Sequence, residues 1–234
     1  MKNISIILAK ELRSLFNSAT AYIIMVVFVG LSGWFFANSL FLQNVASLRS
    51  VFETTPFLML FFAPAITMRL ISEEKKVGTI ELLLTKPIKD QEIIVGKFLA
   101  AWVFFALTLI PTLIYLITIL FLGKADAGPI IGGYLGLLFV GGGFLALGII
   151  GSTLTENQVV AFIISFLIMF ILFIVDKVVS FLPGTLASVF EYLGIDYHFA
   201  NIARGVVDTR DVIYYLSLIG FSLLISTALL ERKK

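Results

Sequence analysis

A charged block at residues 72–88, with the sequence SEEKKVGTIELLLTKPI, lies between two long apolar segments. Ser72 is a candidate helix N-cap, and the two glutamates that follow it favour the start of a helix. Gly78 interrupts this helix, Thr79 can cap a second short helix, and Pro87 ends it. A short helix with an apolar surface and acidic residues is suited to a groove on another protein. An ordinary charged loop is the alternative.

The residue patterns of common enzymes are missing from the sequence. A nucleotide-binding phosphate loop has a glycine five residues before its Gly-Lys pair, but Gln91 and Thr118 stand there instead. The chain has no cysteine, and its single histidine, His198, cannot supply paired zinc ligands, so we interpret it as an interfacial side chain. Ser152 has no general base nearby. We therefore predict a non-catalytic chain without cofactor-binding or metal-binding residues.

The composition is typical of a membrane protein. Hydrophobic residues make up 59% of the chain, charged residues 14%, and the mean hydropathy is +1.05. Soluble domains have about 45–50% apolar and about 25% charged residues. We predict one all-α membrane domain over residues 1–234, because uniformly apolar runs of this length satisfy their backbone in lipid as helices. The six predicted transmembrane helices are residues 20–42, 54–71, 94–122, 129–151, 158–175 and 212–230.

Lysine and arginine are distributed unevenly between the two sides of such a six-helix chain. Twelve of the 17 fall on the side of the termini and the charged block, which predicts that this side is cytoplasmic in the inner membrane. The net charge of +2 is too small to indicate a nucleic-acid partner. Residues 1–18 have apolar side chains at helical spacing, which favours a helix in the membrane interface over a solvated lead-in.

Glycine and proline positions bear on packing. Half of the 18 glycines lie in or beside the fourth segment, where Gly132 and Gly136 form a small-xxx-small pair. This favours tight helix packing over a flexible or substrate-lining helix. Pro64 and Pro111 are expected to kink their helices. Residues 177–210 have helical spacing after a Pro-Gly turn, which predicts two short helices dipping into the outer interface; a plain loop is the alternative.

The charged block, together with the PAITMR stretch at 64–69 before it, resembles the hallmark of type-2 ABC exporter permeases, the ABC-2 family. Three further stretches, at 154–162, 198–199 and 204–215, resemble the gliding-motility-associated branch of that family. The resemblance covers essentially the whole chain. It implies the ABC-2, or type V exporter, permease fold: six transmembrane helices, an N-terminal elbow helix at 1–18, a cytoplasmic coupling region at 72–91 and extracytoplasmic re-entrant helices at 177–210.

The resemblance also implies partners. A separate ABC ATPase subunit, in two copies, would bind ATP and Mg²⁺. Neither ATP nor Mg²⁺ is expected to bind to this chain. The second membrane subunit would be a copy of this chain or a different permease with a large extracytoplasmic domain. The predicted residues of ATPase contact and hinge bending are Glu73, Glu74, Lys75, Gly78, Thr79, Glu81 and Pro87. Ile80 and Leu83 are expected to fill an apolar pocket of the ATPase.

Two other functions stay open at the level of sequence. One is a force-transmitting or scaffold subunit of an envelope complex, in which ATP hydrolysis does conformational work without solute transport. The other is a stand-alone membrane enzyme or channel, which the lack of catalytic residues and of pore-lining charge disfavours. The apolar segments carry no readable code for the identity of a substrate.

Overall fold

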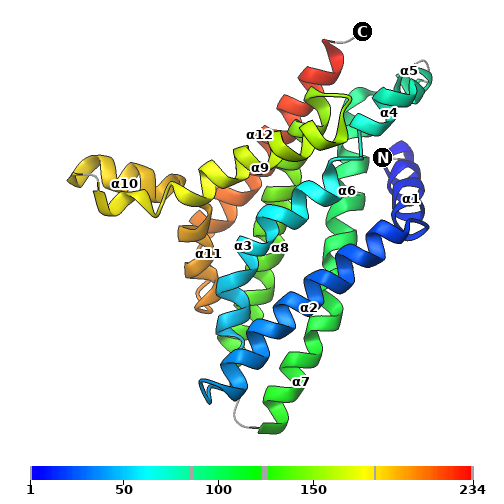
Figure 1. Cartoon of the computed structure of the whole chain (residues 1–234). Coiled ribbons are helices and arrows are strands. Elements are labelled where there is room, and N and C mark those ends of the chain that lie inside the picture. The colour runs from blue at the N-terminus through cyan, green and yellow to red at the C-terminus, as the bar shows by residue number, and fades with distance from the viewer. Residues whose placement is uncertain (1, 85–86, 123–125, 182, 233–234) are drawn as a thin grey trace.

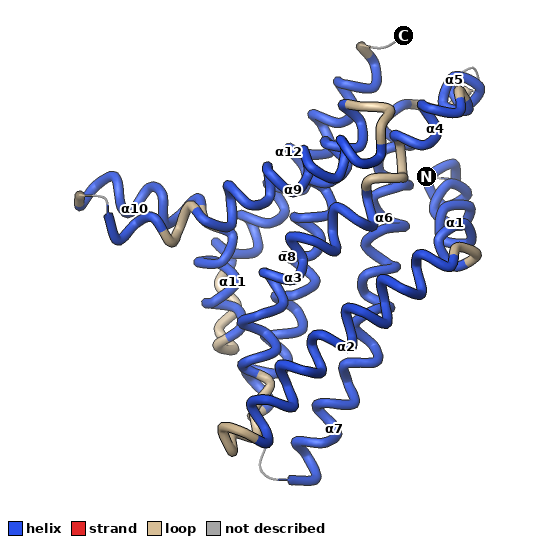
Figure 2. Tube along the Cα trace, in the orientation of Figure 1, coloured by secondary structure: helices blue, strands red, loops and turns tan. Residues whose placement is uncertain are grey.

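The computed structural model describes residues 2–84, 87–122, 126–181 and 183–232. These residues are helical and contain no strand (Figures 1 and 2), so the predicted all-α fold is confirmed. The α-helices are α1 (Lys2–Phe16), α2 (Ala19–Phe41), α3 (Arg49–Thr67), α4 (Ser72–Val77), α5 (Thr79–Leu84), α6 (Asp90–Leu109), α7 (Leu113–Leu122), α8 (Ala127–Leu154), α9 (Gln158–Ile174), α10 (Gly184–Leu193), α11 (Ile195–Ala203) and α12 (Thr209–Glu231).

Five helical stretches of the described residues are long and apolar enough to cross a membrane. They are Ala19–Phe41, Arg49–Val77, Asp90–Leu122, Ala127–Leu154 and Thr209–Glu231. These stretches overlap five of the six predicted segments. The remaining one, at 158–175, coincides with α9, an apolar helix of 17 residues. That length is at the lower end of the range of about 17–25 residues found in transmembrane helices.

Helix α8 is the centre of the bundle. In its apolar window 83% of the residues are buried, against 22% in the windows of α2 and α12. Glycines make this packing possible, because they have no Cβ atom. A Cβ atom added to Gly133 would lie 2.1 Å from the Phe52 ring, and one added to Gly141 would lie 2.1 Å from the Phe105 ring. At this distance a side chain does not fit unless the neighbouring phenylalanine ring moves. The prediction that the glycines serve tight packing is confirmed.

The two prolines have different outcomes. Pro111 lies in a short 3-10 turn, η1 (Ile110–Thr112), which separates α6 from α7 as the sequence predicts. Pro64 lies inside α3, and the helix continues past it, since the Met68 N–H still donates to the Pro64 carbonyl at 2.8 Å. Proline thus interrupts the α-helix in the third apolar segment, and the kink expected at Pro64 stays a prediction.

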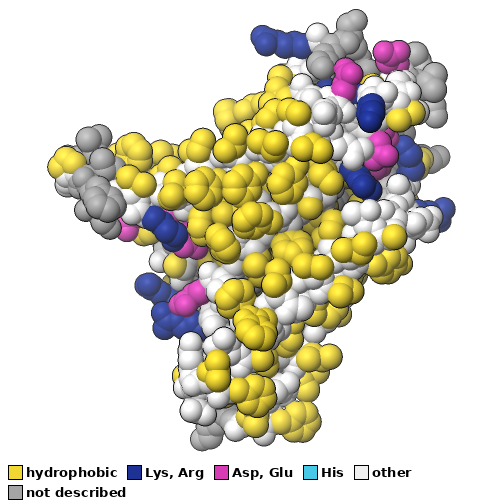
Figure 3. Space-filling view, viewed as in Figure 1, with side chains coloured by type: hydrophobic (Ala, Val, Ile, Leu, Met, Phe, Trp, Pro, Cys, Tyr) yellow, Lys and Arg dark blue, Asp and Glu magenta, His cyan; other side chains and the backbone are white. Residues whose placement is uncertain are grey.

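The two ends of the bundle carry different elements. Helices α1, α4 and α5 and the C-terminal end of α12 lie together at the upper end of Figure 1, whereas α2 and α7 run to the lower end. Charged side chains gather at that upper end and near α10 and α11, and apolar side chains cover most of the visible face between them (Figure 3). This distribution fits a surface that faces lipid between two polar ends.

Two short helices occur in the predicted region 177–210. Helix α10 extends sideways from the bundle, whereas α11 packs against α8 (Figure 1). The interpretation of His198 as an interfacial side chain is wrong, because the corner between α10 and α11 covers it completely. The His198 ring lies 2.6 Å from Asp211 through Nδ1 and 2.9 Å from the Tyr192 carbonyl through Nε2. The histidine thus ties this corner to the first turn of α12.

Candidate functional site

The predicted coupling region forms a corner made of two short helices, α4 and α5. Gly78 joins them in the left-handed conformation, with φ 76° and ψ 5°. Glycine adopts this conformation without the steric cost that a Cβ atom brings. The Gly78 N–H donates to the Lys75 carbonyl at 3.1 Å, and the Thr79 hydroxyl donates to the Glu74 carbonyl at 3.3 Å. The helix interruption predicted at Gly78 is therefore present, and we call residues 72–84 the α4–α5 corner.

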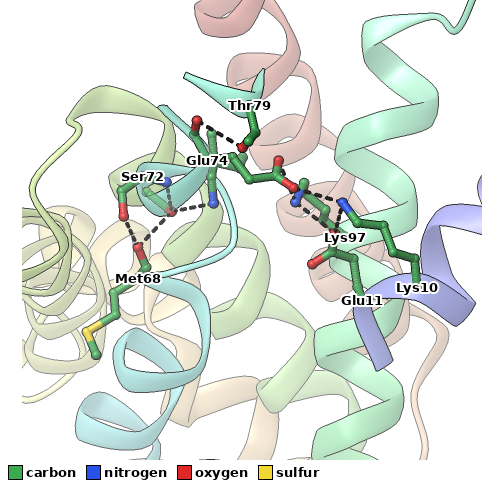
Figure 4. Close-up of polar contacts among 9 residues, drawn as sticks. Lys10, Glu11, Met68, Ser72, Glu74, Thr79 and Lys97 are labelled. Carbon is green, nitrogen blue, oxygen red and sulfur yellow. Dashed lines mark hydrogen bonds and ion pairs between the residues drawn. The ribbon is translucent and has the colours of Figure 1, made fainter. Parts of the chain in front are cut away.

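The α4–α5 corner is fixed to the central helix through Ser152, near the end of α8. The Ser152 hydroxyl accepts hydrogen bonds from the Ile71 N–H at 3.1 Å and the Ser72 N–H at 3.2 Å, and it donates to the Met68 carbonyl at 3.1 Å (Figure 4). One hydroxyl thus uses its donor and both acceptor positions. Ser72 is not the helix cap that the sequence suggests, since Ile71 occupies that position and the Ser72 hydroxyl donates back to Met68.

A second attachment is a network of four charged side chains from three helices. The Lys97 ammonium of α6 lies 3.1 Å from the Glu11 carboxylate of α1 and 2.9 Å from the Glu74 carboxylate of α4. Lys10 of α1 lies 3.1 Å from Glu74 and 3.4 Å from Glu11 (Figure 4). Two positive and two negative charges therefore balance. Because Lys97 is only 1% exposed, its charge depends on these carboxylates for compensation.

The position of α1 against α6 makes this network possible. A Cβ atom at Gly96 would lie 2.8 Å from the Ile7 side chain, so the two helices approach closely at this glycine. The Asn3 amide also donates to the Glu92 carboxylate at 3.0 Å. Burial alone would lower the pKa of the Lys10 ammonium, but the nearby carboxylates outweigh that effect and raise this pKa above its ordinary value.

The structure divides the seven predicted site residues into two groups. Five of them are exposed: Glu73, Gly78, Thr79, Glu81 and Pro87. The other two face their own chain. Glu74 is part of the charged network, and the Lys75 ammonium donates to the Thr153 carbonyl at the end of α8.

The apolar residues of the corner are arranged differently from the expectation. Ile80 is 6% exposed and belongs to the hydrophobic core of the chain itself, so it is not available to a pocket on another protein as the structure stands. The side chain of Leu83 lies outside the described residues. Val77, which the sequence analysis did not single out, is 68% exposed beside Gly78. Among the side chains of the corner that the structure describes, Val77 is therefore the apolar one that is exposed.

Sequence reasoning missed four residues that hold the corner in place: Lys10, Glu11, Lys97 and Ser152. A signal existed for Lys97, since a charged residue inside the predicted membrane segment 94–122 is costly unless it is paired. Its partners on α1 and α4 had no such signal, because they are far away in the chain. Likewise, the hydrogen bonds of Ser152 depend on the packing of α8 against the end of α3, which no sequence pattern reveals.

A comparison with protein-family models matches residues 5–230 to the family described as ABC-2 family transporter protein. The chain belongs to the ABC-2 transporter family. A comparison with curated proteins gave no match. Family membership and the apolar helices make this chain a multi-pass membrane protein and support a permease subunit that is not itself catalytic. Membership of the ABC-2 family also implies, in general, an ABC ATPase as partner.

Proposed function

We propose that this chain is the permease subunit of an ATP-driven transporter, and that the α4–α5 corner is where the ATPase transmits its motion. ATP and Mg²⁺ would bind to the ATPase, in two copies, and not to this chain. One observation carries the proposal: the corner is tied on one side to α1, α6 and α8 and is exposed on the other. A segment with this arrangement can receive a displacement and pass it on.

The exposed side of the corner has the chemistry of a docking surface. Glu73 and Glu81 are exposed carboxylates on α4 and α5, and Val77 lies exposed between them in the chain. Basic groups of a partner would pair with the carboxylates, and an apolar side chain would cover Val77. Glu74 and Lys75 take a different part in this proposal, because they position the corner rather than contact the partner. Gly78 provides the bend that brings both carboxylates onto one corner.

The attached side gives a displacement two routes into the bundle. Through Glu74 and Lys97 it reaches α6 and the elbow-like helix α1. Through Ser152 and Lys75 it reaches the end of α8, the helix along which α3, α9, α11 and α12 pack. A shift of the corner would therefore move the central helix relative to its neighbours. ATP binding can bias this motion only through a difference in ATPase affinity between the two arrangements.

We extend the proposal to the cellular setting. The charge asymmetry supports an inner-membrane location with both termini, and the corner, in the cytoplasm. The stretches at 154–162, 198–199 and 204–215 support membership of the gliding-motility-associated branch. A second membrane subunit, either a copy of this chain or a different permease, would complete the transporter. In the alternative without solute transport, the same corner would pass the work of the ATPase to an envelope complex.

The test of the proposal reverses charge on the exposed side alone. The double variant Glu73→Lys/Glu81→Lys is expected to lose co-purification of an ABC ATPase from native membranes while the permease stays at its normal level. The matched control is Glu191→Lys/Glu231→Lys, which reverses two exposed carboxylates outside the corner and is expected to retain the ATPase. Retention of the ATPase and of permease-stimulated ATP hydrolysis in the first variant would refute the proposal.

A further inference from the structure

A cavity of about 720 Å³ lies at the end of the bundle opposite the α4–α5 corner. Its walls come from the start of α3, the end of α7, the start of α8 and one side of α11. Small-molecule sites typically measure about 300–1,000 Å³, so this volume can hold a ligand rather than a few waters. Nothing in the coupling function requires a cavity at this end.

Part of the cavity lining is apolar. Ile130, Ala200 and Ala203 line the cavity and are partly exposed. Phe52, Ile119 and Phe199 also line it but are almost fully buried, so they offer a ligand little surface. The wall formed by α11 lies directly on α8, because a Cβ atom at Gly132 would stand 2.2 Å from the Ile202 carbonyl oxygen. A ligand in this cavity would therefore gain from covering the partly exposed apolar side chains, at about 25 cal/mol for each Å² of apolar surface removed from water.

Two of the three carboxylates in the wall are paired with cations. Glu53 pairs with Arg49 at 2.7 Å, and Asp196 pairs with Lys177 at 2.7 Å. Arg49 therefore balances the charge of Glu53, whereas Lys177 is shared between Asp196 and Asp176, which lies 3.7 Å from the same ammonium.

The third carboxylate of the lining is Asp126, and the second arginine is Arg204. Asp126 accepts a hydrogen bond from the Gly128 N–H at 3.2 Å and so caps α8. The guanidinium of Arg204, which is exposed at the end of α11, has no ion-pair partner within the part of the chain that the structure describes. Arg204 and Asp126 are thus the two charged groups of the lining that have no ion-pair partner among the described residues, and the guanidinium, with several hydrogen-bond donors, is suited to a phosphate or carboxylate.

We propose that this cavity binds an anionic amphiphile, with its apolar chain on Ile130, Ala200 and Ala203 and its anionic head on Arg204. The proposal goes beyond the coupling function, since it uses none of the residues of the α4–α5 corner. An amphiphile is favoured over a free anion because the cavity offers partly exposed apolar side chains next to an arginine that has no ion-pair partner among the described residues. The lipid-facing helices around the cavity also place it where amphiphiles are concentrated.

The absence of cysteine from the chain allows a direct test. Ala200 lines the cavity, so the variant Ala200→Cys gives a single thiol whose reaction with a water-soluble maleimide reports occupancy. Added oleoyl-lysophosphatidylglycerol is expected to slow this reaction in the full-length protein in detergent. Oleoyl-lysophosphatidylcholine, which adds a positive charge to the same chain length, is expected to need at least about tenfold higher concentration. Inorganic phosphate alone is expected to have no effect.

Substitutions of Arg204 complete the test. Arg204→Gln should raise the half-protecting concentration of oleoyl-lysophosphatidylglycerol about tenfold or more, and Arg204→Lys should restore part of the effect. Arg210→Gln is the matched control, because Arg210 is an exposed arginine that does not line the cavity. Native mass spectrometry of the chain without the cysteine, with and without Arg204→Gln, gives the same comparison independently of labelling. Equal protection by both lipids, protection by phosphate alone, or an unchanged Arg204→Gln variant would overturn the proposal.

Discussion

Lys97 links elements that are far apart in the sequence through a single ammonium group. It lies inside a predicted membrane segment, is 1% exposed, and contacts carboxylates from α1 and α4. Removal of one partner from a buried ion pair costs more than removal of both, because the remaining charge loses its compensation. The network therefore ties the corner to the bundle more strongly than exposed ion pairs would, which typically contribute about 0–1 kcal/mol.

This gives a prediction for Lys97→Met, which keeps the length of the side chain and removes its charge. We expect the free energy of unfolding in detergent to fall by about 3–5 kcal/mol, and ATPase stimulation to be lost. In the triple variant Lys97→Met/Glu11→Gln/Glu74→Gln, most of the stability should return because the one charge that is left, on Lys10, belongs to a side chain that is 60% exposed and can be hydrated, whereas stimulation should not return. Unfolding measurements and ATP hydrolysis assays separate the two effects. Unchanged stability in Lys97→Met would contradict this role.

At the same scale, the sequence predicted some residues of the site and not others. The break at Gly78 was readable, because glycine inside a helix-forming block is the residue that adopts a left-handed conformation most easily. The inward direction of Glu74 was not readable. It depends on α1 lying across α6, which in turn depends on the close approach of Gly96 to Ile7. Such a contact between distant residues leaves no spacing pattern in the chain.

At the scale of elements, the glycines of α8 determine how closely its neighbours pack. Gly141→Ala should lower the free energy of unfolding by about 1–3 kcal/mol, since the added carbon would meet the Phe105 ring at 2.1 Å. Gly220→Ala in α12 is the matched control: no atom lies within 4 Å of the added Cβ, so a neutral or slightly stabilising effect of up to about 1 kcal/mol is expected. Equal effects in thermal unfolding would show that packing at α8 is not limiting.

The sequence predicted the positions of the long helices well, because continuous apolar runs leave few alternatives in a membrane. The apolar stretches matched the helices within several residues, and Pro111 marked the break between α6 and α7. The arrangement of α10 and α11 relative to the bundle could not be predicted from the sequence. Hydrophobic spacing indicated two short helices, but the burial of His198 against Asp211 depends on how their corner folds onto α12.

At the scale of the whole molecule, the two ends of the bundle have separate properties. One end holds the α4–α5 corner and its charged network, and the other holds the cavity lined by Phe52 and Phe199. The central helix α8 runs between them, with Ser152 near one end and Asp126 at the other. If the corner receives motion from an ATPase, α3 and α8 are elements in contact with both sites.

The central claim, that an ABC ATPase docks on the α4–α5 corner, is tested most directly by photo-cross-linking in native membranes. A photo-reactive amino acid is placed at Val77 in one sample and at Val206 in another. The two valines are matched, with side chains 68% and 67% exposed, but Val206 lies beyond α11, away from the corner. We predict a cross-link to an ABC ATPase from position 77 and none from position 206. A cross-link from position 206 alone would contradict the account.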